Sequence, residues 1–460
     1  MTNQYLFSKI LINFAIILLL LTPVINIPAP LFVKSLDVYG AVLFILIFCF
    51  FTIYRMNAPL VLVLVVTVFL VLLSQMFLLE IIYGYGDYTG ISFTARSIIT
   101  VIVAFGSARA LIELYGSIGL SVFIKLIVLC ALLQGAVLWL SFIFPTTREL
   151  MSVLFYRDFG RDADHLILLR VPGFVSTGGD GLSMNHALLC VVGLVGTHII
   201  SPPGRLRQSI FAMLFISMLG TAFTGRSGLY LGFVFMVTII LIQKNRSIDV
   251  WKFYRVFIFF LLLLLVLVSL GGALGSFGKD ILDDHGYEHP IVRLLRGFID
   301  MRDSGSYTDN TISTLLTDMV VLPTGSLQLL FGNNYFGTLP GSEIRTDVGY
   351  FRMLHGIGFF GLVIFLVGIF TIPLLHVRVT MKNLLSKTQN WHERRALRGL
   401  SQLLLVILLF GLVGHYKIFY LSTRIFLFVF FVFLFLIIHR YKMMEATIYK
   451  KNSYAIKHYN

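Results

Sequence analysis

The feature that most constrains the fold is a long series of apolar segments, each near the roughly 20 residues that a helix needs to cross a bilayer. Hydrophobic residues make up 58% of the 460-residue chain and charged residues only 13%, whereas about a quarter of a soluble protein is charged. We predict an all-α, polytopic membrane protein of about twelve transmembrane helices, forming a single domain over residues 1–460. The predicted spans are 8–26, 36–54, 59–82, 92–113, 119–144, 183–200, 208–224, 227–243, 253–275, 347–376, 400–415 and 424–439.

The charged residues divide between two sets of connecting segments. Lysine and arginine are concentrated in the termini and the short segments, whereas most acidic residues lie in two long segments, 145–182 and 276–346. Because basic residues mark the cytoplasmic side of a membrane protein, we predict cytoplasmic termini and place the two long segments on the opposite, outer face. The net charge of +14 then reflects topology and contact with anionic membrane lipids, and we expect no nucleic-acid partner.

The larger outer segment, 276–346, has a structural pattern of its own. Apolar residues recur at helical spacing over 291–299 and again over 312–319, and glycines with a proline punctuate 325–341. We predict a partly helical cap loop, whose amphipathic helices lie on the outer leaflet and cover a cavity between the transmembrane helices.

Basic residues stand in short motifs near the predicted outer face. Arg170, in Arg-Val-Pro-Gly, either clamps an anion through its guanidinium group or extends toward lipid phosphate as an interfacial side chain. Arg226 lies in Thr-Gly-Arg-Ser-Gly, a tight turn whose glycines would let a ligand approach the backbone beside helix ends that favour anions. A plain surface charge is the alternative for Arg226. His415, Lys417 and Arg424 flank the last outer turn and would extend this basic surface.

The entrance of the predicted tenth span combines an acid, two arginines and a histidine. Asp347 and His355 share one helical face, Arg352 lies about one turn from each, and Arg345 precedes them. Charged groups at the mouth of a membrane helix are costly to desolvate, and they are therefore candidates for function. The alternative is an Asp–Arg pair that only closes the cavity wall.

Arginines gathered around one carboxylate suit a substrate that carries a pyrophosphate beside a hydroxyl group that must lose a proton. Arg170, Arg226 and Arg345 would stabilise the charge that develops on the leaving pyrophosphate. Asp347 would act as the general base.

Metal chemistry has weaker support. Cys49, Cys130 and Cys190 lie within apolar runs and lack metal-binding spacing, so we interpret them as small buried side chains. The carboxylates in 162–164 and 283–285 have a spacing that can bind a divalent cation, but such pairs are also common in solvated loops. We expect no metal and no cofactor.

Four sequence elements follow one another along 145–361, and their order carries more information than any one of them. An Arg-x10-Gly pattern also occurs twice, from Arg170 to Gly181 and from Arg345 to Gly356. The four elements are Arg170-Val-Pro-Gly173, Thr224-Gly-Arg226-Ser-Gly228, Leu330-Phe-Gly332-Asn-Asn-Tyr-Phe-Gly337, and Asp347-x-Gly-Tyr350 followed by Gly356-Ile-Gly-Phe-Phe-Gly361. Together with the two long outer loops, these elements resemble the O-antigen polymerase group (Wzy type), which is akin to the O-antigen ligases.

The resemblance implies a metal-independent glycosyltransferase in the bacterial inner membrane, with 145–182 and 276–346 as periplasmic loops. Donor and acceptor would both be glycans carried on undecaprenyl pyrophosphate, and a chain-length-determinant co-polymerase is the implied protein partner. Where the ligases have a histidine near the start of the last element, this chain has Asp347, which favours a polymerase. We assign catalytic roles to Asp347 and Arg345, and substrate or pyrophosphate binding to Arg170, Arg226, Tyr350, Arg352 and His355.

Two alternatives stay open from the sequence. An O-antigen ligase would transfer the finished glycan to lipid A core. A flippase for lipid-linked oligosaccharides would move its substrate without lengthening it, and such transporters often have paired halves and discontinuous helices, neither of which is clear in this sequence.

Overall fold

The computed structural model is helical almost throughout its described part. Besides helices and their connecting turns, the described residues contain a short antiparallel pair of strands, β1 (Val24–Asn26) and β2 (Ser35–Asp37). The described residues are 2–22, 24–26, 35–43, 59–155, 173–174, 180–200, 204–243, 279–280, 282–283, 292, 299, 303, 319–336, 348–387, 391–417, 420–421 and 423–459.

Seven helical stretches of the described residues are long and apolar enough to cross a membrane, so the chain is a multi-pass helical membrane protein. One of these stretches contains α4 and α5, and another contains α16 and α17. The longer helices are α1 (Thr2–Leu21), α3 (Leu60–Tyr83), α4 (Thr89–Tyr115), α5 (Gly119–Ile143), α8 (Asp180–Ile200), α9 (Arg205–Leu219), α10 (Arg226–Gln243), α16 (Gly349–Phe365), α17 (Ile372–Lys387), α18 (Trp391–Lys417) and α19 (Arg424–Tyr459). Short helices are η1 (Gly116–Ile118), α6 (Pro145–Phe155), η2 (Gly220–Phe223), α15 (Ser326–Phe331) and the π-helix η3 (Leu366–Thr371).

Several predicted boundaries differ from the structure. The span expected over 8–26 ends at Leu21, and the chain then enters β1. The span expected over 36–54 begins in strand β2 and is described only to residue 43, and 253–275 lies outside the described residues. The total of about twelve spans therefore stays a prediction. The same holds for the helices expected over 291–299 and 312–319, whereas α15 is a short helix inside the stretch that we expected to be rich in turns.

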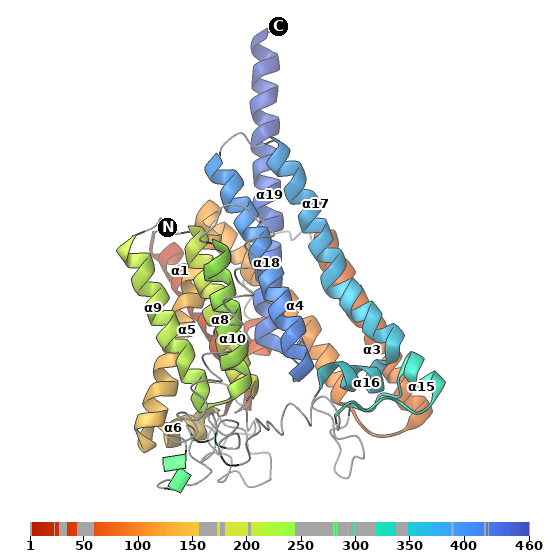
Figure 1. Cartoon of the computed structure of the whole chain (residues 1–460). Helices are drawn as coiled ribbons and strands as arrows, with labels where there is room; N and C mark the ends of the chain where they lie inside the picture. Colours follow the sequence, from red (N-terminus) through yellow and green to blue (C-terminus); the bar gives the residue numbers. More distant parts are fainter. Residues whose placement is uncertain are drawn as a thin grey trace.

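The elements divide between two ends of the bundle (Figure 1). One end, which we call the loop end, carries α6, α15 and the first turns of α8, α10, α16 and α19. The other end carries the first turns of α9 and α18 and the far half of α19, and we call it the basic end because its helices bear Arg205, Arg207 and Arg398. This separation places the motif-bearing elements α10, α15 and α16 at one end of the protein.

Helix α19 lies at the centre of the bundle. Every residue from Ile425 to Ile438 is buried, which is the pattern of a helix enclosed on all sides. It packs against α1, α4, α5, α8, α17 and α18. Edge-to-face aromatic pairs join it to its neighbours, with Phe433 and Phe435 lying 4.9 and 5.3 Å from the rings of Phe123 and Phe105.

The first residue of α19 is fixed by a two-pronged ion pair with strand β2. Both guanidinium NH2 groups of Arg424 donate to the carboxylate of Asp37, and the guanidinium also lies 5.4 Å from the ring of Tyr39. Burial alone would raise the pKa of Asp37, but Arg424 and the backbone N–H groups of Tyr39 and Gly40 together hold that pKa below its usual value. Arg424 therefore does not extend a basic outer surface, as its sequence position suggested, because Asp37 neutralises it.

Helix α16 is broken where the sequence predicted a continuous span over 347–376. Gly358 adopts φ 69° and ψ −178°, a conformation that favours glycine, and so interrupts the helix. A β-carbon at Gly358 would lie 2.5 Å from the carbonyl oxygen of Leu330, and one at Gly332 would lie 2.6 Å from the carbonyl oxygen of Gly356. The two glycines thus allow the end of α15 to pack directly on the break.

The break leaves helix carbonyl groups without their usual partners, and neighbouring segments supply donors. The backbone N–H groups of Asn333 and Asn334 donate to the carbonyls of His355 and Gly356 at 2.8 and 2.9 Å. The side chain of Gln75 in α3 donates to the carbonyl of Ile357 at 2.8 Å. Irregular backbone inside a membrane protein requires such internal partners, because lipid offers none.

We expect Gly358→Ala to destabilise the protein by about 2–5 kcal/mol, because backbone strain of about 1–3 kcal/mol adds to overlap with α15. Gly116→Ala is the nearest control: Gly116 has φ 58° and ψ −131° and nothing within 4 Å of its β-carbon position, so backbone strain applies without overlap. Thermal unfolding of both purified variants in detergent measures the difference. Equal losses would show that the α15–α16 contact contributes nothing.

Candidate functional site

The Thr224–Gly228 motif forms the turn that the sequence predicted, between η2 and α10. Arg226 is the first residue of α10, which places its backbone at the loop end. Gly228 has a different role from the one expected, because its β-carbon position lies 2.6 Å from the hydroxyl oxygen of Ser183 and its N–H donates to that hydroxyl at 3.1 Å. This glycine therefore brings α10 against α8, and it does not face a ligand.

The end of the Arg170–Gly173 motif docks on α5. A β-carbon at Gly173 would overlap the side-chain amide nitrogen of Gln134, and the N–H of Phe174 donates to the amide oxygen of the same side chain at 3.3 Å. The side chain of Gln134 is 2% exposed. Gly173 and Phe174 are thus held against α5 by a polar contact.

The start of α16 packs on the loop end of α18. A β-carbon at Gly349 would lie 2.6 Å from both the carbonyl oxygen and the ring of His415, and the ring of Tyr350 meets that of His415 edge to face at 4.7 Å. The hydroxyl of Tyr350 donates to the carbonyl of Leu412 at 2.8 Å. His415 is fully buried and accepts a hydrogen bond from the N–H of Leu421 at 3.1 Å. It therefore does not belong to an exposed basic surface, in contrast to our expectation.

His355 and Arg352, both predicted to bind substrate, lie further along α16. His355 is 4% exposed, and a ring nitrogen lies 3.1 Å from the carbonyl of Val321, so it fastens the segment before α15 to the helix. Arg352 is partly buried, and its side chain or backbone makes at least one contact with another residue. The contacts of Tyr350 and His355 are positioning contacts, and their binding roles stay predictions.

The remaining predicted site residues are not placed. Arg170, Arg345 and Asp347 lie outside the described residues, and only the backbone of Arg226 is described. Val348 and Gly349, which follow Asp347 directly, are buried at the start of α16. Of the carboxylates in 162–164 and 283–285, only Asp283 is described.

A groove opens beside this group of elements, between α8, α10 and α18, and we call it the α8–α10–α18 groove. It has a volume of about 440 Å³ and is lined by Met184, Ser227, Tyr230, Leu231, Val234, Val413, Gly414, Tyr416 and Lys417. Exposed apolar side chains form most of its wall, including Val234 and Val413 at 43% and 52% exposure. Ser227 at the start of α10 and Lys417 at the end of α18 place polar groups next to the backbone of Arg226.

Only part of this groove could be predicted from the sequence. Lys417 was visible as a charge near the last outer turn, but its partnership with α10 depends on packing between segments nearly 200 residues apart. The position of Ser227 directly after Arg226, within the Thr224–Gly228 motif, could have identified it as a candidate site residue. The apolar wall had no such signal, since its residues resemble any lipid-facing residue of a membrane helix.

No protein-family model matches the sequence, and comparison with curated proteins finds no match. A functional assignment therefore depends on the ordered motifs and on the geometry of the loop end.

We expect Tyr350→Phe to lower the free energy of unfolding by about 1 kcal/mol, because a buried carbonyl of α18 loses its side-chain donor. Chemical or thermal unfolding in detergent measures the change. Tyr416→Phe is the control: Tyr416 also lies at the loop end of α18, is 37% exposed, and its hydroxyl bonds to no described residue. A Tyr350→Phe protein as stable as the control would contradict the docking role.

Proposed function

We propose that the protein polymerises oligosaccharide repeat units carried on undecaprenyl pyrophosphate into O-antigen polysaccharide, at the periplasmic face of the bacterial inner membrane. The observation that carries the proposal is the position of the α8–α10–α18 groove. It joins an apolar wall open to lipid with Ser227 and Lys417, directly beside the turn that holds Arg226.

The groove suits a substrate that is both a lipid and an anion. A polyprenyl chain would lie against the exposed valines and tyrosines of the wall, while its pyrophosphate would reach Lys417 and the first turn of α10. The first N–H groups of a helix have no partners within it and favour an anion; in α10 the N–H of Gly228 is already taken by Ser183, so the N–H groups of Arg226 and Ser227 would serve. A groove built only for a packed lipid would have no need of polar groups at one end.

The proposed reaction is a glycosyl transfer by direct displacement. Asp347 removes the proton from a hydroxyl of the non-reducing sugar of the acceptor, whose oxygen forms a bond to the anomeric carbon of the donor glycan. The bond between that carbon and the pyrophosphate breaks, and undecaprenyl pyrophosphate leaves with its charge stabilised by Arg170, Arg226 and Arg345. The reaction needs no oxidant, cofactor or metal for its balance.

Described residues close in sequence to two of the proposed catalytic groups have well-defined contacts. Gly173 docks on Gln134 three residues after Arg170, and Gly349 docks on His415 two residues after Asp347. Such contacts matter because a general base and a leaving-group clamp contribute only when they are held in the productive geometry. A separate co-polymerase that determines chain length is the expected protein partner.

We expect the single changes Arg170→Ala, Arg226→Ala, Arg345→Ala and Asp347→Ala each to lower polymerisation by about 100-fold or more, since each removes charge stabilisation or the base. The measurement is the length distribution of lipopolysaccharide on a gel, with membrane abundance of each variant determined in parallel. Arg205→Ala, at an exposed site of the basic end, should keep wild-type lengths. Wild-type lengths in all four variants would refute the site.

The same gel separates polymerase from ligase. Loss of a polymerase leaves lipid A core that carries one repeat unit, whereas loss of a ligase leaves bare core. Bare core in the Asp347→Ala strain would assign the protein to the ligase reaction.

A second prediction addresses the groove itself. Val413→Trp should fill the groove and lower the rate at limiting lipid-linked substrate about tenfold or more, corresponding to about 1–3 kcal/mol for an overfilled site. Val63→Trp in α3 is the matched control, because Val63 is 51% exposed against 52% for Val413 and does not line the groove. An in vitro assay with purified protein and lipid-linked repeat unit compares the two. Equal rates would exclude the groove as the donor site.

A further inference from the structure

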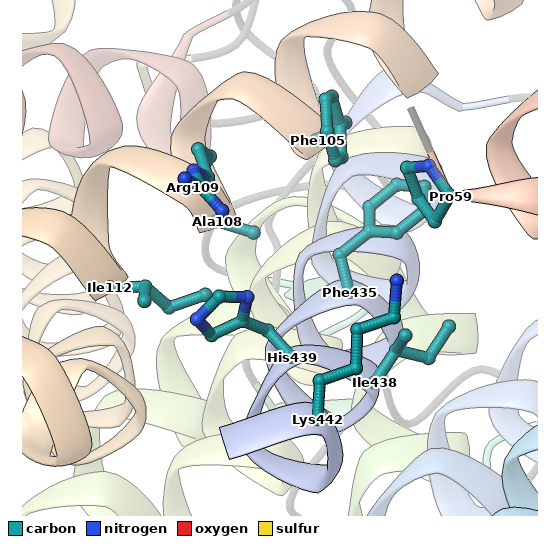
Figure 2. A pocket seen from close by; sticks show the side chains of 9 residues that line it. All are labelled: Pro59, Phe105, Ala108, Arg109, Ile112, Phe435, Ile438, His439 and Lys442. Atoms are coloured by element: carbon teal, nitrogen blue, oxygen red, sulfur yellow. The ribbon is translucent and has the colours of Figure 1, made fainter. Parts of the chain in front are cut away.

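A second pocket lies at the basic end, far from the proposed site along the bundle (Figure 2). It has a volume of about 160 Å³ and lies between the start of α3, the last turns of α4 and the middle of α19. We call it the α4–α19 pocket. Its lining residues are Pro59, Phe105, Ala108, Arg109, Ile112, Phe435, Ile438, His439 and Lys442.

The polar part of this pocket is basic. Figure 2 shows Arg109 and His439 on one side of the pocket and Lys442 on the other. Arg109 is paired with Glu113 one helical turn away on α4. Among the described residues around the pocket there are thus two permanent cations, Arg109 and Lys442, and one carboxylate, Glu113. Lys442 is exposed and available to an added anion.

The rest of the wall is apolar and belongs to the level of the membrane surface. Phe105 and Phe435 pack edge to face at 5.3 Å and form its inner side. The pocket lies at the limits of two apolar stretches long enough to cross a membrane, the start of Leu60–Tyr83 and the end of Arg424–Lys442. Leu60, the residue after Pro59, is 78% exposed and extends the apolar surface from the pocket onto the first turn of α3. A basic pocket between helices at this depth has the position of a lipid headgroup.

We propose that the α4–α19 pocket binds the phosphate of an anionic glycerophospholipid, whose acyl chains lie along the exposed face of α3. A phosphate oxygen would accept hydrogen bonds from Arg109 and Lys442, and the glycerol would cover Phe105, Pro59 and Ile438. The apolar wall favours a lipid over free phosphate, because a small hydrated anion gains nothing from aromatic and proline surfaces. This site is independent of the proposed polymerase reaction, since it lies at the opposite end of the helices.

The test uses the purified full chain in detergent, with thermal unfolding and native mass spectrometry as readouts. Phosphatidylglycerol should raise the unfolding temperature in a saturable manner, whereas phosphatidylcholine, inorganic phosphate and glycerol 3-phosphate at equal concentration should not. Lys442→Gln should weaken the apparent affinity for phosphatidylglycerol about fivefold, the effect of one basic residue near a membrane surface. Arg205→Gln, an equal loss of charge on α9 at the same end, should leave the affinity unchanged.

Lys442 is the decisive position, because changing Arg109 would also leave Glu113 without its partner. Lys442→Arg keeps the charge and should restore binding, which separates a binding role from a purely structural one. Equal stabilisation by phosphatidylcholine would show that the headgroup charge is not recognised, and equal stabilisation by inorganic phosphate would make this a free-anion site. Either result, or a Lys442→Gln protein that matches Arg205→Gln, would overturn the proposal.

Discussion

The arrangement of the helices depends on the enclosure of α19. A helix buried on every side between Ile425 and Ile438 needs neighbours all around it, and α1, α4, α5, α8, α17 and α18 supply them. Burial from water does not drive this packing, since lipid is as apolar as a phenylalanine side chain. The packing is driven instead by the close fit of the side chains, through many small dispersion contacts among aromatic rings. The Asp37–Arg424 pair fixes the first residue of this helix, and an unpaired Arg424 at such a site would be costly.

Hydropathy and length predict the helices whose boundaries coincide with the apolar core of a bilayer. The spans expected over 59–82 and 119–144 match α3 and α5 closely, because the preference of each residue for lipid is a local property. The span expected over 424–439 agrees with the apolar stretch Arg424–Lys442, whereas α19 itself continues to Tyr459, since a helix that leaves the membrane loses its hydropathy signal and keeps its backbone hydrogen bonds. Nor could the sequence reveal that Asp37 pairs with Arg424, because 387 positions separate them.

The candidate site shows a similar division. The sequence identified Gly173, Gly228 and Gly349 as unusual because they stand in ordered motifs, and the structure gives each a close neighbour in Gln134, Ser183 or His415. Their common role is to let segments approach one another, which a motif alone cannot distinguish from approach to a ligand. The break at Gly358 was likewise hidden in an apolar run, because hydropathy does not report φ and ψ. The chemical roles of Arg170, Arg345 and Asp347 stay predictions.

The central place of α19 also has a consequence for how the protein is made. Synthesis runs from the N-terminus, so α19 reaches the membrane after every other described helix. Until then the earlier helices cannot pack against one another in the space that α19 will occupy, and lipid is free to enter that space. Gly411 of α18 illustrates the demand, because a β-carbon there would overlap the ring of Phe426. Assembly therefore ends with the exchange of lipid for a protein helix, and a ribosome that stops before Arg424 releases a bundle without its centre.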